Sequence, residues 1–218
     1  MLKVLLIVLN PFFIFFNKIN YLIYVRKNNA KKLHVGCGNN FIIGWLNTDY
    51  LPRRINVYRL DITKRMPFKK NTFDLIYSEH LIEHVNLNSA AYFLSECFRV
   101  LKPGGKIRIC TPDINFLFSL FMNKNELSRN YVDWFIDENR NSHLNNNIYV
   151  INMFFSSWGH KFIYDANSLK SILLDSGFKD IQLVNDSNYD IDFYGIDNSS
   201  RMPKVFYDFE TMIIDAKK

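Results

Sequence analysis

The sequence predicts an α/β fold built on a mostly parallel β-sheet. Short apolar segments rich in β-branched residues recur along the chain, as is typical of strands that are buried on both faces. Between two of these segments, residues 89–100 carry apolar side chains at helical spacing. This alternation of strand and helix favours parallel pairing of the strands. With 218 residues, the chain is long enough to form one domain with a full core.

The elements follow one another in a definite order. In the first half we expect strands at residues 32–35, 45–49, 55–60, 74–78 and 106–110. The helix at 89–100 precedes the last of these strands, and Pro103-Gly104-Gly105 ends the helix and turns the chain. In the second half we expect helices at 114–122 and 167–176, then strands at 181–184 and 211–216. The last strand is expected to run antiparallel to the rest.

The composition excludes several classes of protein. Lys and Arg number 27 against 21 Asp and Glu, a net charge of +6, but the basic residues are scattered. No dense basic tract is present, so we expect no nucleic-acid partner. The three cysteines show no C-x-x-C spacing, which predicts neither a disulfide framework nor a cysteine zinc site. A reducing compartment, the cytoplasm, fits this pattern best.

Residues 1–25 are unusually apolar. The longest near-continuous stretch, 4–16, is shorter than the roughly 18–20 residues needed to cross a bilayer. It resembles the apolar region of a signal peptide, but no small-x-small cleavage site follows it. Two alternatives remain open. The segment packs on the body of the protein or over a substrate pocket, or it lies at the inner face of the membrane with Lys18, Arg26 and Lys27 at the lipid headgroups.

A glycine-containing loop follows the first predicted strand. Gly36 and Gly38 lack a Cβ atom, so the backbone can turn sharply there and a ligand can lie against it. Asp49 ends the next predicted strand, where a carboxylate can accept hydrogen bonds from both hydroxyls of a ribose. Asp61 follows the third strand, where it can accept from an adenine amino group. The spacing therefore indicates a cofactor site at the carboxyl ends of the strands.

This series of motifs resembles the class I S-adenosylmethionine-dependent methyltransferases, over about residues 31–113. The resemblance rests on Met66-Pro67-Phe68 before Phe73-Asp74, on Glu79-His80-Leu81-Ile82-Glu83-His84-Val85, and on Phe98-Arg99-Val100-Leu101-Lys102-Pro103-Gly104-Gly105. The start at His34 and the segment 158–165 are also similar to small methyltransferase-like proteins encoded with bacterial surface-polysaccharide genes. The family implies a Rossmann-like sheet of seven strands, mostly parallel with an antiparallel last strand and with helices on both faces. It also implies S-adenosylmethionine as the methyl donor.

The resemblance implies which residues bind the cofactor and how the chain is organised. The expected cofactor-binding residues are His34, Gly36, Cys37, Gly38, Asp49, Tyr50, Asp61, Ile62, Ser78 and Glu79. We expect an apolar segment at 1–28 and a single methyltransferase domain at 29–218. Within that domain, residues 29–113 form the cofactor-binding half, 114–160 an insertion or lid, and 161–218 the C-terminal half.

The sequence departs from the family pattern in three places. His34 stands where many members have an acid, and Asn40 replaces the third glycine of the loop. Asn tolerates the left-handed backbone region, so the loop can still form. Only ten residues separate Gly38 from Asp49, which predicts that the usual first helix is very short or missing.

Three other functions compete for the same residues. A nicotinamide-binding domain would need a third glycine three residues after Gly38, where Phe41 stands, and a more distant acid. Residues 80–84 fit the H-x-x-E-H zinc pattern, with Glu83 as a base, but no third ligand is evident, so we expect no metal. If His84 does not bind metal, we expect it to have a structural role at a helix start or on the surface. The third competing function is that of a binding module, which keeps the fold but has no catalytic activity.

Methyl transfer to a sugar hydroxyl requires a base, because an alcohol is a poor nucleophile near neutral pH. His80, which follows the fourth strand, is the first candidate for a base or for orienting the acceptor. His160 and Asp113 are the second and third candidates. For each, a structural role is an equal alternative, such as a helix cap for Asp113.

The acceptor is expected to bind in the second half of the chain. Several aromatic residues there can stack on a sugar ring or pack in the core: Trp134, Phe154, Phe155, Trp158 and Tyr164. The favoured acceptor is a glycan or glycan precursor, and the alternative is a small phenolic or quinone-like metabolite. The oligomeric state does not follow from the sequence.

Overall fold

The computed structural model describes residues 16–17, 19–122, 125–139, 146–185, 190–193, 196 and 202–218. The strands are β1 (Lys32–Val35), β2 (Leu46–Asp49), β3 (Tyr58–Arg59), β4 (Phe73–Glu79), β5 (Leu101–Pro112), β6 (Lys179–Leu183) and β7 (Thr211–Lys217). The α-helices are α2 (Leu87–Val100), α3 (Ile114–Met122), α4 (Glu126–Asn139), α5 (Asn147–Ser156), α6 (Ala166–Asp175) and α7 (Lys204–Glu210). Two single-turn 3-10 helices are η1 (Ile82–His84) and η2 (Ile191–Phe193).

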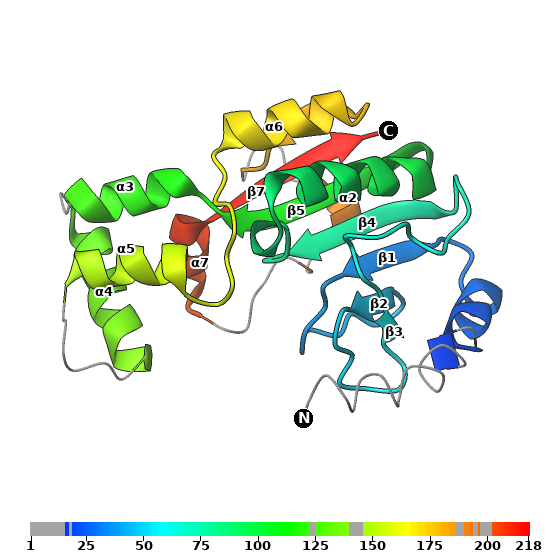
Figure 1. Cartoon of the computed structure of the whole chain (residues 1–218), viewed down its shortest axis with the longest axis horizontal. Coiled ribbons are helices and arrows are strands. Elements are labelled where there is room, and N and C mark those ends of the chain that lie inside the picture. The colour runs from blue at the N-terminus through cyan, green and yellow to red at the C-terminus, as the bar shows by residue number, and fades with distance from the viewer. Residues whose placement is uncertain are drawn as a thin grey trace.

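The strands form one seven-stranded sheet in the order β3-β2-β1-β4-β5-β7-β6 (Figure 1). The strands β1 to β5 pair in parallel, and β7 runs antiparallel to both β5 and β6. The predicted sheet, mostly parallel with an antiparallel last strand, is therefore confirmed. Its carboxyl ends at β1, β4 and β5 meet along one edge of the sheet, as they must in a parallel arrangement.

The fifth strand begins earlier than the sequence indicates. Residues 103–105, expected as a turn, lie inside β5. The carboxyl-terminal residue explains this difference, because Gly104 N donates to Lys218 O at 3.0 Å and Lys218 N donates to Gly105 O at 2.9 Å. These two hydrogen bonds extend the pairing of β5 with the end of the chain to Gly104 and Gly105.

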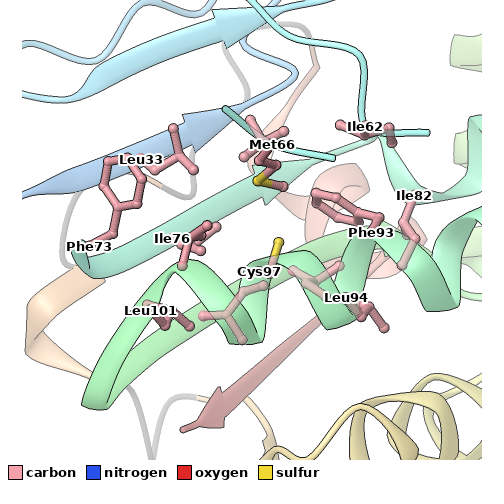
Figure 2. Close-up of a cluster of buried hydrophobic side chains, with 14 of the residues drawn as sticks. Leu33, Ile62, Met66, Phe73, Ile76, Ile82, Phe93, Leu94, Cys97 and Leu101 are labelled. Atoms are coloured by element: carbon pink, nitrogen blue, oxygen red, sulfur yellow. The ribbon is translucent and has the colours of Figure 1, made fainter. Parts of the chain in front are cut away.

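The main core lies between one face of the sheet and the helices α2 and α6. The apolar stripe of α2 buries Phe93, Leu94 and Cys97 against Ile76 of β4 and Leu33 of β1 (Figure 2). The side chain of Asn86 caps this helix by accepting a hydrogen bond from Ser89 N at 2.9 Å. Helical spacing on α2 and two-residue alternation on the strands thus bring both apolar faces together.

The opposite face of the sheet is covered differently. Leu75 and Tyr77 of β4 and Cys110 of β5 pack there against Trp45 and Phe193. Trp45 belongs to the loop before β2, and Phe193 belongs to η2. Among the described residues, loops and this single-turn helix therefore cover the second face. The described residues 36–45 form turns and no helix, in agreement with the short spacing between Gly38 and Asp49.

The helices α3, α4 and α5 lie beyond the carboxyl ends of β4 and β5 (Figure 1). They share a second hydrophobic cluster, which includes Phe116, Tyr131, Phe135 and Phe154. The aromatics look isolated in the sequence because they come from three different helices. These helices, within the segment 114–160 that was expected to form an insertion or lid, therefore share a hydrophobic cluster distinct from the main core.

The described end of the apolar N-terminal segment contacts the main core. Residues 19–27 are helical, Tyr24 is buried, and Tyr21 and Val25 pack beside it. The Tyr24 hydroxyl donates to Lys32 O at 2.8 Å. Residues 1–15, which hold most of the apolar stretch, lie outside the described residues. Within the described part of the chain, no helix is both long and apolar enough to cross a membrane.

Candidate active site

The glycine loop after β1 adopts a conformation that favours glycine. Gly36 and Gly38 have φ angles of 75° and 50°, in the left-handed region. A Cβ atom at Gly36 would lie 2.9 Å from the side chain of Leu81, whereas nothing lies within 4 Å of a Cβ at Gly38. Gly36 therefore allows the loop and Leu81 to approach closely, and Gly38 leaves open space in front of its backbone.

Asp49 holds this loop at the end of β2. Its Oδ2 accepts a hydrogen bond from Gly38 N at 2.9 Å, and its Oδ1 accepts from Leu51 N at 2.8 Å. Each carboxylate oxygen has a second lone pair. Asp49 can therefore accept two further hydrogen bonds from a diol while it fixes the loop.

His34 is buried in β1 next to the loop. Its Nδ1 lies 3.0 Å from Asn47 Oδ1, which as a carbonyl oxygen accepts the hydrogen bond. Burial lowers the pKa of His34, against the opposing effects of the Asn47 hydrogen bond and of the carboxylates Glu79 and Asp49. The ring is therefore neutral at physiological pH, with Nδ1 as its donor.

These residues line one cavity of about 640 Å³ at the carboxyl ends of β1, β2 and β4. This volume lies in the range of cofactor sites. The expected residues that line it are His34, Gly36, Cys37, Gly38, Asp49 and Glu79. Residues that the sequence analysis did not assign to the cofactor also line it: Asn39, Asn40, Leu51, Arg53, His80, Leu81 and His84. Burial raises the pKa of the Cys37 thiol to about 12, so it stays protonated.

Four expected cofactor residues lie outside this cavity lining. Tyr50 is exposed under the Arg59 guanidinium, 5.9 Å from the ring centroid. Asp61 accepts hydrogen bonds from the Thr63 amide and hydroxyl, and Ile62 is buried in the main core. Ser78 is buried, and among the described residues its hydroxyl has no hydrogen-bond partner. These four side chains therefore do not line the cavity that the glycine loop lines.

Glu79, at the end of β4, joins the cavity to the C-terminal half. Its Oε1 accepts from the Tyr207 hydroxyl at 2.8 Å, and its Oε2 accepts from Asn40 Nδ2 at 3.3 Å. Burial is the main cause that raises the pKa of Tyr207, so this hydroxyl remains a donor. Asn40, which replaces the third glycine of the family pattern, thus contacts a wall of the cavity directly.

A second cavity of about 470 Å³ adjoins the first. Aromatic side chains from α4, α5 and the loop that follows α5 line it: Tyr131, Trp134, Phe135, Phe154 and Trp158. Polar groups converge on the same space: His80, Glu83, His84, Glu138, Asn139, His160 and Glu210. His80 and His84 line both cavities, so the two spaces meet at these side chains.

The three candidates for the base lie in different places. His80 has a φ of 45° and lies at the junction, with its Nε2 3.3 Å from Thr211 Oγ1. His160 lines the second cavity only. Asp113 lines neither cavity, and its Oδ1 accepts from Asn115 N at 2.9 Å at the start of α3. This contact is the helix-capping role that was the alternative for Asp113.

Glu83, which the sequence offered only as part of the zinc alternative, is a buried polar residue of the second cavity. Glu83 is fully buried, and its Oε2 accepts from the Thr111 hydroxyl at 3.0 Å. Although burial opposes it, the pKa of Glu83 is lowered, with the neighbouring His80 imidazole as the main stabilising cause. Burial raises the pKa of Tyr164 to about 12, and the Glu83 charge adds to this effect. The only sequence signal was a match of residues 80–84 to a zinc pattern.

Comparisons with known proteins agree with this geometry. Residues 49–109 match the Methyltransferase domain family. An uncharacterised protein of Methanocaldococcus jannaschii is 33% identical over 106 residues, which cover 42% of this chain. The alignment spans 46% of that relative, less than half of its length.

Two solved structures share the fold. A SAM dependent methyltransferase from Archaeoglobus fulgidus superposes with a TM-score of 0.54 and 19% identity, covering 91% of this chain and 90% of that one. An S-adenosylmethionine dependent methyltransferase from Mesorhizobium loti gives 0.52 and 13%, covering 88% and 92%. The chain therefore shares the fold of these two enzymes, and its residues 49–109 match a methyltransferase domain.

Proposed function

We propose that this protein transfers a methyl group from S-adenosylmethionine to a hydroxyl of a sugar or glycan precursor. The observation that carries the proposal is the pair of adjoining cavities that share His80 and His84. One cavity holds the glycine loop and Asp49, and the other is lined by aromatic rings. Two substrates bound in these spaces would meet at the two histidines.

The residues of the first cavity fit the cofactor. Gly38 presents open backbone, and Asp49 has unused lone pairs at the end of β2, where a ribose diol can bind. Neutral His34 on β1 and the carboxylate Glu79 on β4 line the same space. When bound, S-adenosylmethionine supplies a methyl group on a sulfonium, which an oxygen nucleophile displaces from sulfur.

The second cavity combines the two features that carbohydrate sites need. Flat apolar surfaces are supplied by Trp134, Phe135 and Trp158, on which a sugar ring can stack. Carboxylates are supplied by Glu138 and Glu210, which accept hydrogen bonds from hydroxyl groups. Tyr131 donates its hydroxyl to Glu210 and so fixes this carboxylate at the cavity wall. A polyol uses both kinds of surface, whereas a phenol uses mainly the rings.

We assign His80 the role of accepting the proton of the acceptor hydroxyl. Its ring lies between the two cavities, and its Nδ1 is 3.4 Å from Glu83 Oε1. A base is needed at this place, because an alcohol is a poor nucleophile near neutral pH. The side chain of Thr211 limits the rotation of the ring from the other side. Removal of the proton leaves an alkoxide-like oxygen, which is the better nucleophile.

Calorimetric titration with S-adenosylhomocysteine tests the cofactor site. We expect one saturable site per chain in the wild type and a loss of affinity of about tenfold or more in Asp49→Ala, because the charge-assisted contacts to Gly38 N and to the ribose hydroxyls are removed. Asp175→Ala is the matched control, since it removes an exposed carboxylate at the end of α6. Unchanged binding by Asp49→Ala, or no binding by the folded wild type, would contradict the proposal and favour a binding module without catalysis.

A transfer assay with labelled S-adenosylmethionine tests the acceptor class. Nucleotide sugars and free monosaccharides form one panel, and phenols and quinols of similar size form the other. Methylation of the sugar panel is the expected result. Methylation of phenols alone would contradict the proposed sugar acceptor and favour a phenolic or quinone-like acceptor. A role in bacterial surface-polysaccharide synthesis rests on the resemblance of the His34 region and of residues 158–165, and sugar methylation would support it.

We also propose that the N-terminal segment contacts the cytoplasmic face of a membrane. Leu22 and Ile23 are exposed on the helix 19–27, and Arg26 and Lys27 are exposed next to them. This combination suits an interface with anionic lipid. Cosedimentation with anionic vesicles should be lowered by the double substitution Leu22→Ser and Ile23→Ser. Binding that is equal in the wild type and the variant would contradict the contact.

A further inference from the structure

Three potential metal ligands lie together in the wall of the second cavity. One donor atom each from Glu83, His84 and His160 lies within 4.8 Å of the other two. Glu83 and His84 belong to η1, and His160 comes from the loop that follows α5. The imidazole rings of His84 and His160 face each other edge to face, with centroids 4.9 Å apart.

The backbone fixes this cluster from both sides. Lys161 N and Phe162 N both donate to Glu83 O, at 2.7 and 3.2 Å. Trp158 and Gly159 adopt positive φ angles of 54° and 82°, which turn the chain immediately before His160. The loop that carries His160 is therefore tied directly to the residue that carries the carboxylate.

Glu83 brings an unsatisfied carboxylate oxygen to the cluster. Its side chain is 0% exposed, and among the described residues no group reaches its Oε1 with hydrogen-bond geometry. The nearest nitrogens are His80 Nδ1 at 3.4 Å and His84 Nε2 at 3.9 Å. A buried charged oxygen without a hydrogen bond is costly, and a bound cation would satisfy it.

Both imidazoles are oriented as metal ligands usually are. His160 Nδ1 lies 2.7 Å from Phe154 O and donates to it, which leaves the Nε2 lone pair available. His84 hydrogen-bonds to the backbone of Trp158, and its Nε2 is the nitrogen directed at Glu83. Metal-bound histidines typically donate their other N–H to a backbone carbonyl in this way, because that contact fixes the tautomer and the ring.

We propose that Glu83, His84 and His160 bind a divalent transition metal ion, with zinc as the best match to the ligands. Two imidazole nitrogens and one carboxylate oxygen are the ligand set of zinc sites that keep a fourth position open. Zinc bonds of about 2.0–2.1 Å place tetrahedral donors about 3.4 Å apart. His84 Nε2 and Glu83 Oε1, at 3.9 Å, are close to that separation before any ion is bound.

The fourth position of the ion faces the second cavity, which all three ligands line. An oxygen of a bound acceptor is the chemical group that fits there. The metal site depends only on the three side chains, so it can be tested without knowing the acceptor. The sequence predicts no metal site, because no third ligand for residues 80–84 is evident in it. The structure supplies His160, distant in sequence, and the ligands are Glu83 and His84 rather than a pair of histidines on one helix.

Zinc titration of the untagged, chelator-treated full chain tests the proposal. We expect one saturable Zn²⁺ site per chain and at least a tenfold loss of affinity in His160→Ala and in Glu83→Gln. His34→Gln is the matched control, because His34 is a histidine outside the cluster and its loss should leave zinc affinity unchanged. Co²⁺ gives a second readout, since its absorption reports tetrahedral coordination and should be lost in His160→Ala.

Each outcome decides the proposal. His160 is only partly buried, so its alanine variant should fold even if Glu83→Gln does not, and circular dichroism checks this. No saturable zinc binding by the folded wild type would overturn the site, as would binding that His160→Ala retains at full affinity. Titration of the same samples with S-adenosylhomocysteine separates this result from the cofactor site. Zinc binding without S-adenosylhomocysteine binding would contradict the proposed methyltransferase activity and leave the metal site standing.

Discussion

The two cavities are built in different ways, although they adjoin. The cofactor cavity is made by the ends of neighbouring parallel strands, and its key groups are loop backbone and the carboxylates Asp49 and Glu79. The second cavity is made by side chains from helices that share a hydrophobic cluster separate from the main core. The first therefore depends on local backbone geometry, and the second on packing between distant segments. Changes in one region should affect the other little, except at the histidines they share.

The largest expected effect is on the free energy of unfolding, and it tests whether the two hydrophobic clusters are independent. Phe116→Ala removes a buried ring from the cluster of α3, α4 and α5 and should lower the free energy of unfolding by about 3–5 kcal/mol. The affinity for S-adenosylhomocysteine should change less than about twofold, because these helices do not line the cofactor cavity. Urea unfolding and calorimetry measure the two quantities.

The control for this prediction is Phe118→Ala in the same helix. Phe118 is 60% exposed, so its removal should change the free energy of unfolding by less than about 0.5 kcal/mol. If Phe116→Ala folds but loses cofactor binding, the two regions are coupled, which would contradict the independence of the two cavities.

His80 lines both cavities, so its substitution tests the chemistry at the place where the two cavities meet. His80→Ala should lower kcat by about 100-fold or more, the usual contribution of a general base. The affinity for S-adenosylhomocysteine should fall far less, because the glycine loop and Asp49 remain. The pH profile of kcat checks the role, since the limb that rises with pH should disappear. A variant that keeps both kcat and that limb would exclude His80 as the base.

The two glycines test the backbone basis of the cofactor cavity. Gly36→Ala and Gly38→Ala both place a side chain at positive φ, which costs about 1–2 kcal/mol. Only Gly36→Ala also meets Leu81, with its Cβ at 2.9 Å from that side chain, and overpacking adds about 1–3 kcal/mol. Gly36→Ala should therefore be the more destabilised in thermal melting. Equal melting temperatures would show that Leu81 moves aside without cost.

The smallest expected effect is on the pH dependence of the free energy of unfolding. Because burial lowers the pKa of His34, the unfolded chain takes up a proton more readily than the folded one. The contribution of neutral His34 to the free energy of unfolding is fully present above the ordinary imidazole pKa of the unfolded chain. It is lost as the pH falls from that pKa towards the lowered pKa of the folded protein, by at most about 1.4 kcal/mol per pH unit. His84 is shifted in the same direction, also by burial.

Urea midpoints between about pH 7.5 and about pH 5.5 measure this loss. His34→Asn should show a shallower fall than the wild type, without abolishing it, because His84 remains. A slope that does not change in His34→Asn would mean that His34 is not buried in neutral form.

Much of the cofactor half could be predicted because its signals are local. The β-branched runs predict β1 and β4, and helical spacing predicts α2, because each pattern reflects burial against the layer beside it. The short gap between Gly38 and Asp49 likewise predicts the missing first helix, since a crossover of that length has no room for one. The antiparallel last strand followed from the family resemblance, and the structure confirms it.

The sequence by itself determined the α/β sheet, the glycine loop and Asp49 at its strand end, because neighbouring residues define all three. Tertiary structure alone decided that Asn40 contacts Glu79 and that aromatics from three helices form one cluster. It also decided that His160 lies beside Glu83 and His84, which are 77 and 76 residues earlier in the chain. Such contacts depend on where long connections return, and no local period in the sequence carries that information.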